Sequence, residues 1–513
     1  MGQVFIIGAG PGDPGLLTAR GVRLLAQADV VVYDRETEAV LRWARPDAER
    51  IVAGGPAERE TAQDAISMLI AEKARDGHVV ARLKWGDPFV FDSGAKEAMF
   101  LHEQGVSFEV VPGVPAAIGM PAYAGIPVTH PGGSDVLVLI RGREDSRSEP
   151  PDLDWEALGR LDATIVCYTD GRLASAVLRQ LMDHGMPEDT AAALITQGTL
   201  PSQQTVTGTL QSLCELAAAD LSTASGLLIV GEVTNLRDHL RWFDERPLFG
   251  RRVVVTRSQE QAQELIDELE NLGAQTIQAP TFRVTPPDDP EALDRAAASV
   301  DDYDWVIFES ANAVTRFLSA LSRGPRDVRA LGDVRICAIG PSAADRLIAG
   351  GLKPDIVVAE FGGEGVGEMM HAMAPLTDAH VLILRPDHVR GVIGDDLNRR
   401  GAAVDDLVVY RTAPAASDSP AAQSLYRTLL DGQVDAVTFT SATAVRRFAA
   451  LIGEEQATDL LNTTTVVAIG PVTAAAAREM GIENVLVPDS YTVSGLVQVL
   501  VEHFSPAAVA SVR

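Results

Sequence analysis

The stretch Trp242-Phe243-Asp244-Glu245-Arg246-Pro247-Leu248-Phe249-Gly250 divides the chain into two parts. A helix-like run over residues 235–243 ends in it, because Pro247 cannot continue a helix and a glycine at 250 is typical of a loop. Next comes Val253-Val254-Val255, a β-branched run of the kind that forms a buried strand. The sequence therefore predicts a first domain over residues 1–246, a linker over 247–250, a second domain over 251–503 and a tail over 504–513.

Length and composition indicate a globular protein of several units. At 513 residues the chain exceeds the roughly 250–300 residues at which one hydrophobic core stops growing. Its 46% hydrophobic and 22% charged residues are ordinary for a globular fold. No apolar run approaches the ~18 residues of a membrane helix, and no signal peptide precedes the strand expected at Val4–Ile7. We expect a cytoplasmic protein with no membrane partner.

The charge and the cysteines argue against two further classes. The net charge of -28 argues against a nucleic-acid partner, because binding to a phosphate backbone needs a cationic face. Cys167, Cys214 and Cys337 lie far apart, and no cysteine or histidine pair has metal-ligand spacing. We expect neither a metal site nor a disulfide framework.

A glycine-rich loop follows the first expected strand. Residues 8–15 read GAGPGDPG and lead into a helix-like run over residues 16–29. A dinucleotide-binding fingerprint would need glycine where Asp13 stands, and Pro11 lacks the amide that a phosphate would accept from. The loop is better suited to a ligand that approaches the backbone closely without a phosphate being bound.

Six further motifs follow in a fixed order. They are Val31–Arg35, Arg82–Phe89, Val110–Gly113, Pro121–His130, Thr207–Leu210 and Leu228–Val233. Together with the glycine-rich loop they resemble uroporphyrinogen-III C-methyltransferases of the tetrapyrrole methylase family over residues 1–246. The resemblance implies two α/β lobes, at about residues 1–112 and 113–246, with S-adenosyl-L-methionine between them and a homodimer formed through this half.

The resemblance also assigns site residues. The cofactor-binding positions that it implies are Pro11, Gly86, Asp87, Val90, Ala116 and Gly198. Asp34 matches the proton acceptor proposed for the family, although a cap at a helix start after a strand explains an aspartate there equally well.

Several positions depart from the family pattern. Gly55 replaces a lysine, Ser93 and Pro131 replace arginines, Thr169 replaces a methionine, and Asp92 adds an acid. Uroporphyrinogen carries eight carboxylates, so each lost charged hydrogen bond would cost about 1.5–3 kcal/mol. Two alternatives follow: an active methylase that leads toward precorrin-2, for siroheme or cobalamin, or a catalytically impaired half that serves as a scaffold or dimerisation platform.

The second half is an internal repeat. Three pairs of segments correspond: Val253–Arg257 with Val381–Arg385, Val306–Phe317 with Val437–Phe448, and Cys337–Ala344 with Val467–Ala474. Their offsets of 128 to 131 residues are too long for a solenoid and indicate two copies of one α/β unit. Short β-branched runs alternate with helix-length segments, which predicts two lobes with a cleft between them. Each lobe is expected to be a parallel, flavodoxin-like sheet covered on both faces.

This half resembles uroporphyrinogen-III synthases. The resemblance rests on the repeated Ser-x-x-Ala-Val-x-x-Phe units, the two Ile-Gly-Pro turns and the segment Val409–Thr412. It implies one lobe over about 251–284 with 412–503 and another over 285–411. The implied reaction cyclises hydroxymethylbilane to uroporphyrinogen III with inversion of the last pyrrole ring, and it needs no cofactor.

Candidate residues of this half lie where strands end. Ser310, Ser342, Ser441 and Thr473 follow strands in both copies, where their hydroxyls could receive substrate carboxylates. Plain helix capping explains each equally well. Tyr410 corresponds to the family's tyrosine and could give a proton to the departing hydroxyl, with packing at a hinge as the alternative. A two-lobed ligand sensor is a third interpretation of the repeat.

Overall fold

The computed structural model describes residues 2–53, 59–133, 135–142, 150–220, 226–257, 259–358, 365–387 and 392–505. The chain forms two compact units. The first is Met1–Arg251 with Leu269–Gln275 and Val501–Arg513, and the second is Arg252–Glu268 with Thr276–Leu500. Within the described ranges, no helix has both the length and the apolar character needed to span a bilayer.

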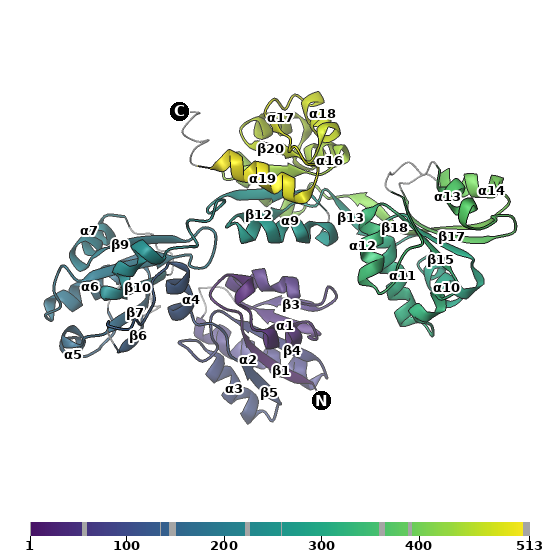
Figure 1. The fold of residues 1–513 in the computed structure, drawn as a ribbon. Coiled ribbons are helices and arrows are strands. Elements are labelled where there is room, and N and C mark those ends of the chain that lie inside the picture. Colours follow the sequence, from purple (N-terminus) through teal and green to yellow (C-terminus); the bar gives the residue numbers. More distant parts are fainter. Residues whose placement is uncertain are drawn as a thin grey trace. The chain divides into compact units, whose positions relative to one another are not determined.

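The first unit begins with a five-stranded parallel sheet of order β3-β2-β4-β1-β5 (Figure 1). Its strands are β1 (Gln3–Gly8), β2 (Val30–Tyr33), β3 (Glu49–Val52), β4 (Val79–Lys84) and β5 (Phe108–Val111). The accompanying helices are η1 (Pro14–Leu16), α1 (Ala19–Leu25), η2 (Arg35–Trp43), α2 (Arg59–Arg75) and α3 (Gly94–Glu103). Successive residues of β1 enter separate apolar clusters, Phe5 and Ile7 in one and Val4 and Ile6 in the other. The sheet is therefore buried on both faces, as parallel sheets usually are.

A second sheet follows in the same unit, with order β6-β7-β10-β8-β9. Only β6 and β7 run parallel, and the other neighbours are antiparallel. The strands are β6 (Leu137–Arg141), β7 (Thr164–Thr169), β8 (Ala191–Thr196), β9 (Gln204–Thr209) and β10 (Gly226–Val230). The helices are α4 (Ala116–Tyr123), α5 (Trp155–Arg160), α6 (Gly171–Asp183), α7 (Leu210–Asp220), η3 (Glu232–Leu236) and α8 (Arg237–Leu240).

The dividing stretch packs on the first unit. Trp242 donates from Nε1 to the carbonyl of Ala122 at 3.0 Å. The rings of Trp242 and Phe243 lie 5.1 and 4.7 Å from that of Tyr123, in edge-to-face geometry. Edge-to-face aromatic pairs add to the burial energy of the rings, so these contacts hold the stretch against α4.

The second unit contains a sheet of order β12-β11-β19-β20-β21. Its strands are β11 (Arg252–Val255), β12 (Gln275–Gln278), β19 (Ala436–Phe439), β20 (Thr465–Ala468) and β21 (Val485–Leu486). The helices in these parts of the chain are α9 (Gln259–Asn271), α15 (Pro420–Leu430), α16 (Ala442–Ile452), α17 (Glu454–Asn462), α18 (Pro471–Glu479) and α19 (Val493–Phe504). Numbered along the chain, the strands have the order 2-1-3-4-5 of a flavodoxin-like sheet.

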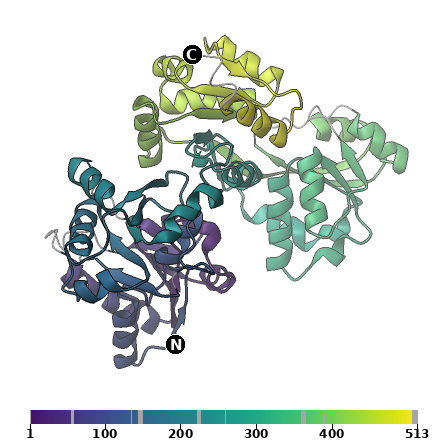
Figure 2. The ribbon, with the colours of Figure 1, turned by 60° about the vertical axis from the view of Figure 1, so that its left-hand side comes forward.

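The other sheet of this unit has the order β13-β18-β17-β14-β15-β16. Its strands are β13 (Phe282–Thr285), β14 (Trp305–Phe308), β15 (Arg335–Ile339), β16 (Ile356–Val358), β17 (His380–Pro386) and β18 (Ala403–Pro414). The helices are α10 (Glu291–Ala298), η4 (Val300–Asp302), α11 (Ala311–Arg323), η5 (Val328–Leu331), α12 (Pro341–Ala349), α13 (Val366–Met373) and α14 (Val392–Arg399). Helices cover both faces of this sheet, as Figures 1 and 2 show, and an apolar cluster lies on each face.

The repeat is visible in the strand orders. Without β13, which pairs antiparallel with β18, the remaining strands have the order 2-1-3-4-5 when counted from β17. The segments that correspond in sequence therefore occupy corresponding strands, β11 with β17 and β14 with β19. Phe308 and Phe317 make an edge contact at 5.5 Å, and Phe439 and Phe448 repeat it at 5.4 Å. The predicted α/β class with flavodoxin-like lobes is confirmed.

Candidate active sites

Two backbone loops meet at the carboxyl edge of the first sheet. The amide of Gly86 donates to the carbonyl of Gly10 at 2.9 Å, and the amide of Gly10 donates back at 3.2 Å. Gly86 has φ +66°, which a side chain would oppose. A Cβ on Gly113 would lie 2.1 Å from the Gly86 carbonyl oxygen, so the loop after β5 also fits closely against this pair.

The carboxylate of Asp87 holds these loops together. Its two oxygens accept from the amides of Phe89 at 2.8 Å and Gly113 at 3.0 Å. The side chain thereby joins the loop after β4 to the loop after β5. Asp87 orders the backbone on which a ligand would lie, a role that sequence reasoning did not separate from direct ligand contact.

The structure brings most of the expected cofactor residues to one helix. A Cβ on Gly86 would lie 3.6 Å from the amide nitrogen of Ala116, where α4 begins without a side-chain cap. The ring of Pro11 packs on Gly119 of α4, and Gly198 packs on Met120 of the same helix. Val90 lies in the loop after β4, where its amide donates to the carbonyl of Asp87 at 3.3 Å. The hydroxyl of Tyr168 accepts from the amide of Ala117 at 3.2 Å, so the first turn of α4 has one side-chain partner, and the amide of Ala116 beside Gly86 remains for a ligand.

Buried charges gather at the ends of β2 and β4. The Arg82 guanidinium donates to Asp34 at 2.9 Å and to Glu97 at 3.2 Å. The Lys84 ammonium lies 2.7 Å from Asp92, 3.5 Å from Glu97 and 3.7 Å from Asp34. The side chains of Arg82 and Lys84 are only 1% and 3% exposed. We call these five residues the charge network.

The ionisation of the charge network is set by burial and by its two cations. Desolvation raises the pKa of Asp92 and outweighs the attraction of Lys84. Desolvation also acts on Glu97, but there the charges of Arg82 and Lys84 prevail and lower its pKa. Glu97 is thus held ionised, while Asp92 takes up a proton more readily than an ordinary aspartate.

The position of Asp34 excludes one of its two interpretations. Asp34 precedes η2, but its side chain makes no capping hydrogen bond. The hydroxyl of Thr37 donates instead to the main-chain carbonyl of Asp34 at 2.7 Å. The helix-cap interpretation is therefore wrong, because the carboxylate points to Arg82 and Lys84.

The departures from the family pattern have structural consequences. The Lys84 ammonium donates to the hydroxyl of Ser93 at 2.7 Å, so a cation still lies next to the position where arginine is lost. The added acid, Asp92, faces Lys84 and is neutralised there. Pro131 is exposed in a turn, and the hydroxyl of Thr169 donates to the carbonyl of Asp170 at 2.8 Å. Gly55 lies outside the described residues.

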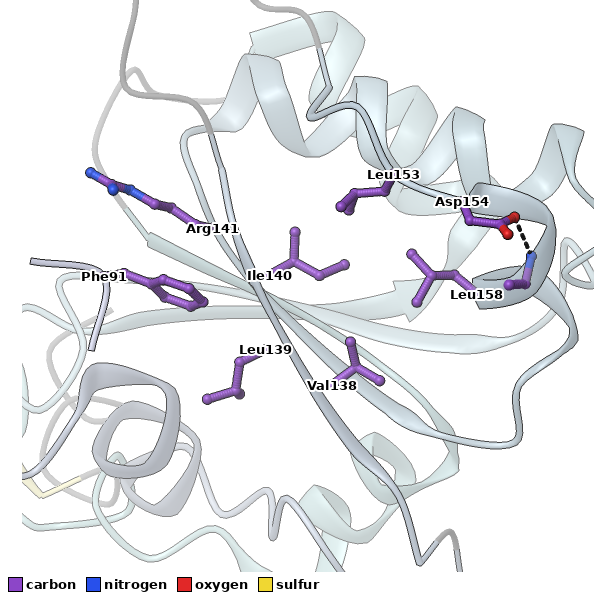
Figure 3. A pocket seen from close by; sticks show the side chains of 9 residues that line it. Phe91, Val138, Leu139, Ile140, Arg141, Leu153, Asp154 and Leu158 are labelled. Carbon is purple, nitrogen blue, oxygen red and sulfur yellow. Dashed lines mark hydrogen bonds between the residues drawn. The ribbon is translucent and has the colours of Figure 1, made fainter. Parts of the chain in front are cut away.

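An apolar cavity of about 500 Å³ lies beside β6 in the first unit. Figure 3 shows Phe91 and Arg141 at one end and Leu153 and Leu158 toward the other. The dashed line in Figure 3 joins Asp154 to the amide of Ala157, an ordinary helix cap at 3.0 Å. None of the expected site residues lines the cavity.

In the second unit, two expected hydroxyls cap helices. Ser310 accepts from the amide of Ala313 at 3.1 Å, and Ser441 accepts from that of Ala444 at 3.1 Å. The capping interpretation is thus correct for both. Only Ser310 has a further partner, since the buried Tyr410 donates its hydroxyl hydrogen to it at 3.1 Å.

The other two hydroxyls differ between the copies. Ser342 is exposed in the first turn of α12. Thr473 is buried in the first turn of α18. Ser310 and Ser342 follow strands of one sheet, in which Tyr410 lies on β18, whereas Ser441 and Thr473 follow strands of the other. Equivalent positions in sequence therefore differ in their access to a ligand.

Sequence reasoning missed several charged groups. Arg82 and Lys84 are two residues apart in β4 and so share one face of the strand, a signal that the sequence contained. Arg257 follows β11, and burial lowers its pKa, although the charge of Glu264 opposes this. Its Nε has no hydrogen-bond partner in the part of the chain that the structure describes. Arg257 is therefore a cation available to a carboxylate.

The described residues contain no group of three or more histidine, cysteine, aspartate or glutamate side chains arranged to hold a metal ion. Comparison with known proteins gives two family matches. The family described as tetrapyrrole (corrin/porphyrin) methylases matches residues 3–214, and that described as uroporphyrinogen-III synthase HemD matches residues 263–498.

Individual relatives cover one or both parts. A porphyrin biosynthesis protein HemD from Ruminiclostridium josui is 32% identical over 517 residues, covering 98% of each chain. A uroporphyrinogen-III C-methyltransferase from Bacillus subtilis is 37% identical over 332 residues, which are 64% of this chain and 68% of the relative. A siroheme synthase from Neisseria meningitidis is 44% identical over 246 residues, 48% of this chain and 50% of that protein.

These findings give no support to the alternative of an impaired first half. Its family match is intact, and its added acid is paired within the charge network. Both expected resemblances are confirmed. The chain belongs to the porphyrin biosynthesis family in which a tetrapyrrole methylase domain is fused to a uroporphyrinogen-III synthase domain.

Proposed function

We propose that the second half cyclises hydroxymethylbilane to uroporphyrinogen III and that the first half methylates this product toward precorrin-2. The observation that carries the proposal is the pair of family matches in this chain, together with the relative that aligns over 98% of both chains. In the fused chain, the product of the synthase half would be the substrate of the methylase half. The first half would also form a homodimer.

In the synthase half, the chain must bind an acidic, flexible tetrapyrrole and control how its ends meet. The uncommitted Nε of Arg257 and the hydroxyl of Ser342 are suited to substrate carboxylates. Ser310, Ser441 and Thr473 lie at helix starts that follow strands, where main-chain amides can also bind carboxylates. Tyr410 holds Ser310 and is the residue that the family resemblance offers for protonating the departing hydroxyl.

In the methylase half, the residues around α4 fit S-adenosyl-L-methionine. When bound, this cofactor supplies an electrophilic methyl group. The start of α4 and the main chain of Gly86 would contact it, with Pro11, Val90, Ala116 and Gly198 around them, and Asp87 would keep the loops in place. Asp34 would accept the proton that the pyrrole loses on methylation, and Arg82 orients its carboxylate.

The test is an assay of the full chain. Hydroxymethylbilane is supplied with and without S-adenosyl-L-methionine, and the isomers and methylated products are separated. We expect uroporphyrinogen III in both cases and methylated product only with the cofactor. Absence of methylated product from added uroporphyrinogen III would contradict the methylase part alone.

Asp34→Asn separates the two halves. Loss of the proton acceptor should lower methyl transfer by about 100-fold or more. Cyclisation should be unchanged, because Asp34 belongs to the first unit, and an unchanged urea-unfolding midpoint of that unit shows that the variant folds. Methyl transfer at the wild-type rate would remove Asp34 from the mechanism.

A further inference from the structure

Glu309 is a buried acid that the synthase chemistry described so far does not use. It follows β14 directly, and its amide continues the sheet by donating to the carbonyl of Leu384 at 3.1 Å. The residue is 6% exposed, and neither carboxyl oxygen has a hydrogen-bond partner among the described residues. Buried polar groups are almost always paired, so an unpaired carboxyl indicates a role beyond packing.

The internal repeat shows that the fold does not require this acid. The equivalent position in the other copy is Thr440, directly before Ser441. The two copies share the same serine cap at 3.1 Å and the same phenylalanine pair. The strand-to-helix turn therefore forms equally well without a carboxyl group.

Burial and the neighbouring charges bring the pKa of Glu309 close to neutral pH. Burial raises the pKa of Glu309 to about 7, while Arg385 on β17 opposes the rise and Asp406 on β18 adds to it. Arg385 is itself engaged, since its Nε donates to Asp406 at 2.6 Å. On β15, burial and then the charge of Glu309 raise the pKa of the Cys337 thiol, which is therefore uncharged. Glu309 can thus hold or release a proton at the pH of the reaction.

Its location fits the synthase site. Glu309 lies at the carboxyl edge of β14, next to Ser310, to which Tyr410 donates. Alternation along β14 places Glu309 on the face of Ile307 and Cys337, whereas Tyr410 belongs to the cluster on the opposite face. Two acidic groups therefore flank the strand end from opposite sides, and a carboxylic acid is a far stronger proton donor than a phenol.

We propose that Glu309, in place of Tyr410, is the proton donor for loss of the terminal hydroxyl, an inference that rests on the proposed cyclisation of hydroxymethylbilane. The bond from carbon to the hydroxyl oxygen breaks, and the hydroxyl leaves as water with the proton of Glu309. The electron pair of the pyrrole nitrogen forms the new exocyclic double bond, which gives the azafulvenium cation with its N–H proton retained. After ring closure, the Glu309 carboxylate takes the proton released from the ring carbon, which restores the acid.

The test compares Glu309→Gln, Glu309→Thr and Glu309→Asp in the full chain. Formation of uroporphyrinogen III is measured against pH and corrected for spontaneous closure. The wild-type rate should fall as the pH rises through about 7, because the donor must be protonated. In the Gln and Thr variants this fall with pH should disappear, and the rate should be lower by at least about 100-fold. The Asp variant should keep the fall with pH.

Two controls separate the possible failures. Methyl transfer to added uroporphyrinogen III should be unchanged in every variant, which checks the first unit, and an unchanged urea-unfolding midpoint of the second unit checks that the substituted unit is folded. A wild-type chain that forms no uroporphyrinogen III would overturn the proposed function itself. Wild-type cyclisation with the same fall with pH in both Glu309→Gln and Glu309→Thr would overturn the role of Glu309 alone.

Discussion

At the scale of single residues, Lys84 joins four other side chains of the proposed methylase site. Its ammonium is shared by Asp92, Glu97 and Asp34 and by the hydroxyl of Ser93. Without it, only Arg82 would oppose three buried or partly buried carboxylates. The loss of a partner from a buried ion pair leaves charges that neither water nor protein compensates.

Lys84→Met should therefore destabilise the first unit by about 3–5 kcal/mol. Unfolding by urea, followed by a signal from this unit, measures the change. Lys96→Met is the matched control, because its ammonium is 60% exposed and lies 3.5 Å from Asp64. An exposed pair is worth about 1 kcal/mol or less. Equal effects of the two substitutions would mean that the charge network does not stabilise the fold.

Tyr410→Phe should reduce cyclisation by more than about tenfold while costing only about 1 kcal/mol of stability. The reason is that its hydroxyl donates a hydrogen bond to Ser310, which follows β14 at the proposed synthase site. Tyr303→Phe, just before β14 of the same sheet, is the control, since it also removes a tyrosine hydrogen bond, the one to Asp405 at 2.6 Å. The measurement is the rate of uroporphyrinogen III formation, compared between the two variants. A Tyr410→Phe enzyme as fast as Tyr303→Phe would remove Tyr410 from the site.

At the scale of elements, the loops after β1, β4 and β5 make up the proposed cofactor site. Gly113→Ala would place a Cβ against the Gly86 carbonyl and force these loops apart. Overpacking of this kind costs about 1–3 kcal/mol, which corresponds to a rise of about tenfold to hundredfold in Kd. Isothermal titration with S-adenosyl-L-methionine measures it in the full chain.

Gly133→Ala is the matched control for this substitution. A Cβ at Gly133 would lie 3.4 Å from the nearest atom, the carbonyl oxygen of His130, which is an ordinary contact. Its Kd for the cofactor should equal that of the wild type. If Gly113→Ala also binds normally, the loops around Gly86 are not the cofactor site.

Elements that depend on local pattern were predictable from the sequence. The turn from Phe308 to α11 and the turn from Phe439 to α16 recur because the same apolar strand, serine and alanine-valine pattern recurs. The direction of the Asp34 side chain was not predictable. It depends on Arg82 and Lys84, which are 48 and 50 residues away in sequence, and a cap and an ion pair need the same residue type.

At the scale of the whole chain, the two families and the repeat could be read from ordered motifs. The alternative of a weakened methylase is not supported. It treated each substitution separately. Asp92 and Ser93 both contact Lys84, so the added acid and the position of the lost arginine each have a cation beside them. The unpaired state of Glu309 was equally hidden, since sequence does not show which carboxyl lacks a partner.

The most direct measurement follows the isomer formed when the full chain receives hydroxymethylbilane alone. The account predicts that uroporphyrinogen III, with its last ring inverted, forms faster than closure in buffer. A folded chain that yields only the uninverted isomer at the rate of the buffer would contradict it.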